Sequence, residues 1–143
     1  MSDQVTARDL GLNVASGDEK ELFKWFIASF LFGKRIQQDI AVDTYRVIVE
    51  KHDRDTPRKL CNCSRQELVN MLGEGNYTRY DESTADRLLE LCKKLNDEYG
   101  GEVSQIHQAS ENRKELEQRL GEFKGIGPKT VEIFMREAAK RWY

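Results

Sequence analysis

The chain has 143 residues, an ordinary size for a single folded domain. Its 23 Lys and Arg residues are nearly balanced by 25 Asp and Glu residues, and a formal net charge of -2 excludes strong binding to nucleic acid or acidic membranes through overall charge alone. Aromatic residues make up 9% of the chain and lie with aliphatic residues in periodic segments, which excludes a disordered protein. An anionic partner must therefore bind a local cluster of basic residues.

Helix is the element type that the sequence favours throughout. The chain has two prolines, Pro57 and Pro128, so long stretches are free to form helix. We therefore expect an all-α, multi-helix bundle, with a polar segment over residues 1–15 followed by one helical domain over residues 16–143. Because the polar, acidic start of the chain has no apolar leader and no apolar run is long enough to span a bilayer, we expect a soluble, cytoplasmic protein.

The first predicted helix begins at residue 16 and ends near Gly33. Ser16 and Glu19 have the spacing of a capping box, in which two side chains bond to each other's backbone amides. The segment Leu22 to Phe32 is apolar on nearly every face, which predicts a helix surrounded by others at the centre of the core. A second helix follows, with apolar residues three and four apart up to Ile48, and we expect Pro57 to close it.

Three more elements precede the last part of the chain. Ser64 is a good N-cap for a short helix, which Gly73 to Gly75 should end in the left-handed conformation. Asp81 or Ser83 should cap a long amphipathic helix that ends at Gly100 and Gly101. A short turn with Val103 and Ile106 then leads to a helix over residues 110–120.

The turn from Gly125 to Pro128 is the strongest candidate binding site. Two glycines flank Ile126, which we expect to fill the angle between two helices, and Pro128 suits the first position of the next helix. Glycines at a helix N-terminus leave N–H groups free to bind a phosphate. From residue 124 to the end of the printed sequence, five basic residues face two acidic ones, a net charge of +3.

Phe123 to Thr130 resembles the helix-hairpin-helix motif, which contacts the DNA backbone without regard to base sequence. Leu22 to Val49 and Gly75 to Val103 resemble, in order and spacing, segments of endonuclease III-like DNA glycosylases, so the resemblance covers roughly residues 20–142. It implies that the chain binds double-stranded DNA in connection with base excision repair. The DNA-binding residues that it implies are Lys124, Gly125, Ile126, Gly127, Lys129 and Thr130.

The sequence departs from this family at the residues that carry catalysis. Family members that cleave DNA use the lysine at the position of Lys129 to form a Schiff base, and an aspartate about eighteen residues later, for which the sequence ending at Tyr143 has no counterpart. Lys34 stands where the family has a glutamine that fills the gap left by a flipped base. The family's four-cysteine iron–sulfur loop is missing too, so we expect no cofactor.

Other polar residues leave alternatives open. Lys129 is a catalytic nucleophile or a phosphate-contacting lysine, and Asp39 and Asp43 are substitute acids or part of a solvated helix face. Tyr77 and Tyr80 either stack on bases or pack beneath their loop.

The cysteines and histidines favour no metal site. Cys61, Cys63 and Cys92 have the spacing of neither a metal site nor a disulfide framework, and we expect reduced thiols. His52 and His107 have no ligand partner at a suitable spacing.

Three functions follow, in order of preference. The first is a DNA-binding module, the second a minimal glycosylase or abasic-site lyase using Lys129, and the third a helical protein–protein adaptor. A fold without the family's last helices would expose apolar surface, so a homodimer or a partner subunit is also expected.

Overall fold

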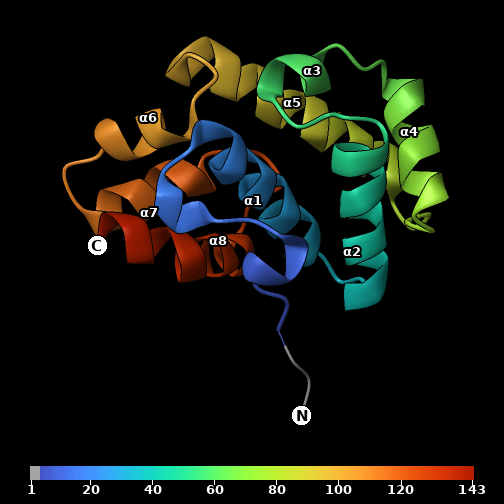
Figure 1. Cartoon of the computed structure of the whole chain (residues 1–143). Helices are drawn as coiled ribbons and strands as arrows, with labels where there is room; N and C mark the ends of the chain where they lie inside the picture. The colour runs from blue at the N-terminus through green and yellow to red at the C-terminus, as the bar shows by residue number, and fades with distance from the viewer. Residues whose placement is uncertain (1–3) are drawn as a thin grey trace.

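The computed structural model describes residues 4–143, and these form helices and connecting loops without a strand (Figure 1). The predicted all-α fold is confirmed. The α-helices are α1 Glu19–Phe32, α2 Gln38–Tyr45, α3 Pro57–Cys61, α4 Arg65–Glu74, α5 Asp81–Tyr99, α6 Val103–Gln108, α7 Arg113–Gly121 and α8 Pro128–Trp142. Two 3-10 turns, Arg8–Leu10 and Val14–Ser16, precede α1, and a π-helical segment, Arg46–Lys51, extends α2. Within the described part of the chain, no helix is both long and apolar enough to cross a membrane.

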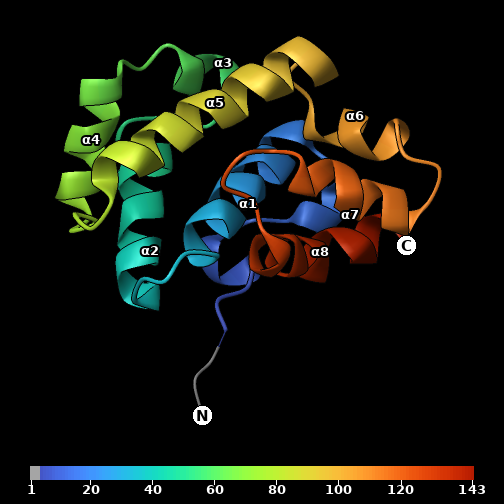
Figure 2. The ribbon, with the colours of Figure 1, turned by 180° about the vertical axis from the view of Figure 1, so that it is seen from behind.

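Helix α1 is the centre of the core, as predicted. It lies between α2 and α4 on one side and α6 to α8 on the other, with α5 crossing above (Figures 1 and 2). Trp25, Phe26 and Phe30 are fully buried. The Phe26 ring meets the edges of Phe123 and Phe134 at centroid distances of 5.5 and 5.4 Å. Such aromatic contacts favour one packing arrangement, so α1 fixes the position of α8 and of the turn that precedes it.

The segment before α1 belongs to the same core. Ala7, Leu10, Leu12 and Val14 are buried, and the Ala7 amide donates to the Glu137 carboxylate at 3.0 Å. The segment expected to be a polar extension thus packs against α8, and the packed domain starts upstream of residue 16.

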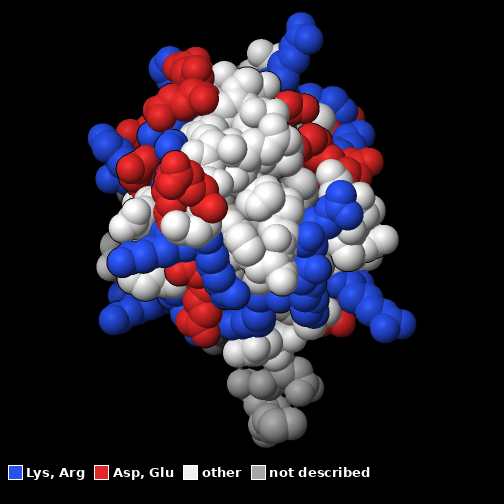
Figure 3. Space-filling model, turned by 90° about the vertical axis from the view of Figure 1, so that its left-hand side faces the viewer, with Lys and Arg blue, Asp and Glu red and all other residues white. Residues whose placement is uncertain are grey.

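The described surface has little exposed apolar area. Its only large exposed hydrophobic side chains are Tyr80 and Tyr143. On the side that carries α6 and the end of α8, Lys and Arg gather in the lower part, beside an uncharged band (Figure 3). Among the described residues, the large hydrophobic side chains thus form no exposed cluster that would favour the predicted homodimer. The homodimer stays a prediction without this support.

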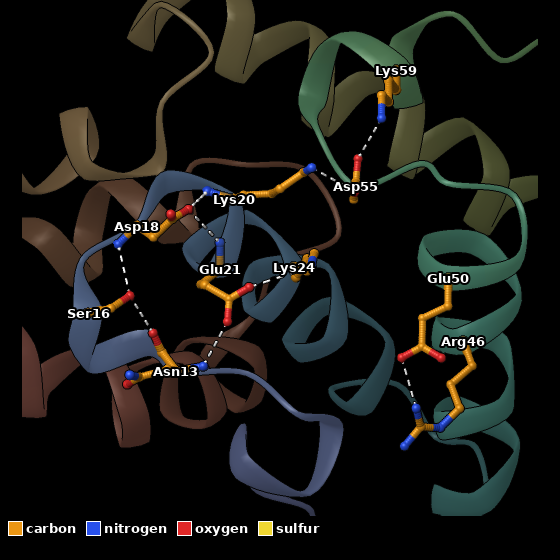
Figure 4. Close-up of polar contacts among 10 residues, drawn as sticks. All are labelled: Asn13, Ser16, Asp18, Lys20, Glu21, Lys24, Arg46, Glu50, Asp55 and Lys59. Carbon is orange, nitrogen blue, oxygen red and sulfur yellow. Dashed lines mark hydrogen bonds and ion pairs between the residues drawn. The ribbon is translucent and has the colours of Figure 1, made fainter.

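The cap of α1 differs from the predicted capping box (Figure 4). Asp18 is the N-cap, and its carboxylate accepts from the amides of Lys20 at 2.8 Å and Glu21 at 3.4 Å. Ser16 instead accepts from the Asp18 amide at 3.2 Å. The reason is the left-handed turn at Gly17, which places Asp18, rather than Ser16, directly before the first helical residue.

The region between α2 and α4 also differs from the prediction. Arg46–Lys51 widens into a π-helical segment, and Pro57 starts α3 at its first position instead of closing the second helix. The Thr56 hydroxyl caps α3 by accepting from the Lys59 amide at 3.2 Å. Proline at a helix start and proline beyond a helix end have similar local sequence contexts, so the pattern alone did not separate them.

Helix α4 has the predicted cap but a different end. Ser64 and Glu67 form a complete capping box. Gly75 follows α4 with a φ of -87°, so the predicted left-handed ending is wrong. A Cβ at Gly75 would lie 2.7 Å from the Thr44 Cα atom, so glycine is needed for the close approach of α2.

Helix α5 ends as predicted, at a left-handed Gly100, but begins differently. Its N-cap is Tyr80, with a φ of 60°, and neither Asp81 nor Ser83 caps it; among the described residues no side chain does. The segment expected to be a short turn with Val103 forms α6.

The end of α1 packs directly on the start of α8. A Cβ built at Gly33 would lie 1.9 Å from the Thr130 Oγ1 atom and 3.1 Å from its Cα atom. The side chain of Thr130 is buried between the end of α1 and the start of α8. The two helix ends therefore cannot move apart without opening the core. Glycine at position 33 is therefore required for this helix crossing.

We expect Gly33→Ala to lower the free energy of unfolding by about 1–3 kcal/mol, because the added methyl group forces α1 and α8 apart. Urea unfolding followed by circular dichroism measures it. Gly73→Ala is the matched control, since a Cβ at this position in α4 meets nothing within 4 Å among the described residues. Equal stability of the two variants would contradict the close contact.

Asp55 joins the loop after α2 to α1 and α3 (Figure 4). Its nearly buried carboxylate lies 3.2 Å from the Lys20 ammonium and 3.1 Å from that of Lys59. Burial acts to raise the pKa of Asp55, but the hydrogen bonds from Lys59 and Lys20 outweigh it and the pKa is lowered. A lowered pKa stabilises the fold above the unfolded pKa, near 3.9, and this contribution is lost as the pH falls below it.

We expect Asp55→Asn to reduce stability at pH 7 by about 1–2 kcal/mol, with the difference from the parent shrinking as the pH falls below about 4. Urea unfolding at both pH values measures it. Asp53→Asn is the control, because Asp53 also binds Lys59, at 2.9 Å, but is largely exposed. A deficit for Asp55→Asn that is as large in acid as at pH 7 would contradict the role of the charge.

Candidate nucleic-acid interface

The turn between α7 and α8 contains Gly125 and Gly127, which differ in conformation and surroundings. Gly125 has a φ of 86°, a conformation that favours glycine. A Cβ there would lie 3.1 Å from the Phe30 Cε1 atom and 3.3 Å from the Arg87 Cγ atom. Ile126 is buried, as expected for a side chain that fills the angle between the helices. The turn is therefore held in one conformation by its contacts with α1 and α5.

Gly127 forms the exposed tip of this turn. It is the N-cap of α8, where no side chain among residues 4–143 accepts a hydrogen bond from the first helical turn. A Cβ at Gly127 would find open space, with no described atom within 4 Å, and its φ of -104° suits any residue. The positive end of the 15-residue helix α8 therefore faces solvent at a position that an anion can approach.

Two largely exposed lysines flank the tip. The side chains of Lys124 and Lys129 are 71% and 59% exposed. Lys124 lies 3.6 Å from Glu90, and Lys129 lies 3.8 Å from Glu132. Ion pairs this long and exposed contribute little stability, so a phosphate can displace the carboxylates at small cost.

The remaining two predicted DNA-binding residues face inward. The side chains of Ile126 and Thr130 are buried, against the core and against Gly33 respectively. Any contact between DNA and these two residues would therefore use their backbone groups rather than their side chains.

The basic residues nearer the C-terminus form a weaker cluster than their count suggests. Arg136 lies 3.7 Å from Glu132, and Lys140 lies 3.4 Å from Glu137. A Cβ at Gly17 would lie 2.9 Å from the Arg141 guanidinium, so this side chain lies against the turn before α1. The net charge of +3 is thus spread along α8 and partly neutralised.

Lys34 links the end of α1 to the hairpin turn. Its ammonium group donates a hydrogen bond to the Gly125 carbonyl and lies 4.4 Å from the centre of the Phe30 ring. Burial, and then the charge of Arg87, lower the pKa of Lys34. Lys34 therefore bonds to the turn within the protein.

A cationic cavity of about 350 Å³ lies beside this lysine. It is lined by Lys34 and Arg35 at the end of α1, by Arg79 and Tyr80 from the loop before α5, and by Arg87 on α5. Gly125 lines it too, so it adjoins the hairpin turn. None of the described residues that line it is acidic. We define the cationic cavity by the side chains of Lys34, Arg35, Arg79 and Arg87.

Sequence reasoning found only part of this cavity. The loop with Tyr77, Arg79 and Tyr80 had two alternative interpretations, stacking on bases or packing beneath the loop, and the structure decides between them for Tyr77 only. Tyr77 is buried beneath the loop, whereas Tyr80 is 69% exposed and lies 5.2 Å from the Arg79 guanidinium. Arg35 and Arg87 were missed, since each is a single charge on an otherwise ordinary helix end or face.

Lys129 lines a smaller cavity of about 190 Å³, without a carboxylate among the described lining residues. Phe32 and Ile133 are among its walls. Asp39 and Asp43, the candidate substitute acids, are exposed on α2 and lie outside it. The structure therefore does not bring the candidate lysine and the candidate acids together in one cavity.

Both histidines contact neighbouring side chains. All three cysteines are free, and the described residues contain no group of three or more ligands suited to a metal ion. The His52 Nε2 atom lies 2.8 Å from the Glu74 carboxylate, and the His107 ring stacks on Trp142 at a centroid distance of 4.5 Å. These contacts account for both histidines without a catalytic role.

Comparison of the chain with protein-family models, with curated proteins and with solved structures finds no match. The site is therefore interpreted from its own residues.

Proposed function

We propose that the chain binds double-stranded DNA without sequence preference, through the turn between α7 and α8. The observation that carries the proposal is the open space at Gly127, the exposed N-cap of α8, between the exposed side chains of Lys124 and Lys129. A phosphate at this position receives backbone N–H groups and the positive end of the helix dipole. Lysines on either side add charge without reading the bases.

A connection with DNA repair is the part of the proposal that rests on resemblance. The hairpin and the segments Leu22 to Val49 and Gly75 to Val103 resemble those of the endonuclease III-like superfamily. The turn is braced by α1, which begins the first of these segments, and by Arg87 in the second. The parts that resemble the superfamily are thus the parts that shape the proposed contact.

We expect modest binding to a duplex of any sequence, with a slope of log K against log salt of about -2 to -4, because two to four phosphates are neutralised. Fluorescence anisotropy at several salt concentrations measures the slope. Gly127→Ala should weaken binding, since the new methyl group occupies the phosphate position and lowers the quality of the N-cap.

Gly73→Ala is again the control, because it adds a methyl group to an equally open position on α4. A zero salt slope in the parent, or equal binding by Gly127→Ala and the parent, would favour the protein–protein adaptor over DNA binding.

A lyase that uses Lys129 is the alternative function. Schiff-base formation needs a neutral amine, and lysines in enzymes obtain one through desolvation or a cationic neighbour. The Lys129 side chain is 59% exposed, and its ionic neighbour, Glu132, is an acid. The exposed Lys129 side chain at the start of α8 is placed to contact a phosphate.

We therefore expect Lys129→Ala to lower DNA affinity by about twofold to fivefold, as for the loss of one phosphate contact. Neither the parent nor the variant should give a borohydride-trapped adduct on abasic duplex DNA. The trapping assay uses denaturing gels, with Lys124→Ala as a control for the loss of one exposed charge. An adduct formed by the parent and absent from Lys129→Ala alone would make the lyase the better assignment.

A further inference from the structure

The cationic cavity holds positive charge that the protein leaves largely unneutralised. Of its four cations, only Arg87 forms an ion pair within residues 4–143, with Glu90 at 2.7 Å. Lys34 donates to a neutral carbonyl, and Arg79 lies over the Tyr80 ring. Burial, and then the charge of Arg87, disfavour the charged form of Lys34 and lower its pKa. An anion that enters the cavity relieves this repulsion.

The shape of the cationic cavity favours the end of a nucleic-acid strand over an uninterrupted sugar-phosphate backbone. Its volume of about 350 Å³ lies in the range of small-ligand pockets, roughly 300–1,000 Å³. Phe30 and Tyr77 are buried side chains of its lining, so the cavity is a hollow in the surface rather than a projection. The backbone of an intact duplex meets projecting groups such as Gly127 more readily than it enters a hollow.

The number of cations favours a doubly charged group. A phosphate monoester carries a charge of about -1.5 to -2 at neutral pH, more than the single charge of a phosphodiester. Arg35, Arg79 and Arg87 each present a guanidinium group, which binds phosphate oxygens through paired hydrogen bonds. The cavity therefore supplies both the charge and the donors that a terminal phosphate needs.

Tyr80 adds a surface for a base at the rim. Its ring is 69% exposed, although its backbone φ of 60° is uncommon for a residue other than glycine. Aromatic rings stack on bases of any identity, which suits a site without sequence preference. A nucleotide at a strand end presents both a phosphate and an unpaired face of a base.

We propose that the cationic cavity binds the phosphate monoester at a DNA strand end, with the terminal base against Tyr80. The proposal rests on the proposed function and names its substrate class, because the turn at Gly127 holds the duplex that leads to this end. Gly125 lines the cavity and belongs to the same turn as Gly127, so the two sites adjoin at this residue.

Three blunt duplexes of one sequence test the preference: one with hydroxyl groups at all ends, one with 5′-phosphates and one with 3′-phosphates. We expect one phosphorylated duplex to bind at least about fivefold more tightly than the hydroxyl duplex in anisotropy titrations at fixed salt. Equal affinity for all three duplexes would overturn the inference and leave the proposed function standing.

Substitutions locate the preference. Arg35→Ala and Arg79→Ala change exposed side chains of the cavity, and each should reduce the affinity ratio between the phosphorylated and hydroxyl duplexes. Tyr80→Asn removes the ring while keeping a residue that tolerates a positive φ, and should also reduce the ratio. Arg58→Ala is the matched control, an exposed arginine on α3 outside the cavity, and should keep the parent's ratio. A ratio unchanged in all three cavity variants would overturn the assignment to this cavity.

Two further measurements distinguish this proposal from the proposed function, and a phosphate at a strand end from free phosphate. Gly127→Ala should weaken binding of all three duplexes by the same factor. Calorimetry with a phosphorylated trinucleotide and with its hydroxyl form measures the cavity without a duplex. Preference for the phosphorylated trinucleotide with no duplex binding would support the cavity and contradict the proposed function. Inorganic phosphate binding as tightly as the phosphorylated trinucleotide would overturn the assignment to a strand end.

Discussion

The contact between the end of α1 and the turn that joins α7 to α8 determines the geometry of that turn and of the first turn of α8. Gly33 meets Thr130, and Lys34 donates to the Gly125 carbonyl, so two adjacent residues hold both the first turn of α8 and the loop before it. Phe26 adds a third contact through Phe123 and Phe134. Because α1 is buried on nearly every face, it cannot shift to relax these contacts without exposing aromatic surface. The helix thus serves as a rigid support for a turn that has few stabilising contacts of its own.

The electrostatics of the molecule depend on where charges are paired rather than on how many there are. Lys93 pairs with Asp97, and Lys94 with Glu98, one turn apart along α5. Such exposed pairs contribute little stability, but they cancel the local field of each cation. Lys34, Arg35 and Arg79 have no such pairing within the described residues, so they dominate the local field although the whole chain is slightly acidic. A formal charge of -2 is therefore compatible with an anion-binding site.

The sequence predicted the elements whose signals are local. The apolar segment of α1, the amphipathic face of α5 and the glycine turn before α8 each follow from residues within one or two helical turns, and all three are confirmed. The prediction was wrong where the outcome depends on contacts between distant segments. The sequence predicts a left-handed helix ending at Gly75, but glycine is needed there because Thr44 approaches closely. The N-cap at Asp18 is an exception, because that error is local: it depends on the left-handed turn at Gly17, which the Ser16 to Glu19 spacing does not encode.

The candidate site shows the same division. Lys124, Gly125, Gly127 and Lys129 are neighbours in sequence, and the motif pointed to them directly. The cationic cavity combines the end of α1, the loop before α5 and the first turns of α5, and only the fold brings their charges together. For Thr130 the sequence was misleading. Its place in the motif suggests that its side chain contacts DNA, but that side chain is buried against Gly33.

The proximity of turn and cavity has an energetic consequence for a ligand that reaches both. An ammonium group has three donors, so Lys34 can keep its bond to the Gly125 carbonyl while it contacts an anion in the cavity. Binding in the cavity therefore need not release the turn. Once the turn holds a duplex, a phosphate at its end is confined to a small volume, which raises its effective concentration at the cavity. On the proposed function, two individually weak contacts would then combine on one DNA end, whereas an uninterrupted duplex would gain only the first. This difference would let a slightly acidic domain discriminate between the two.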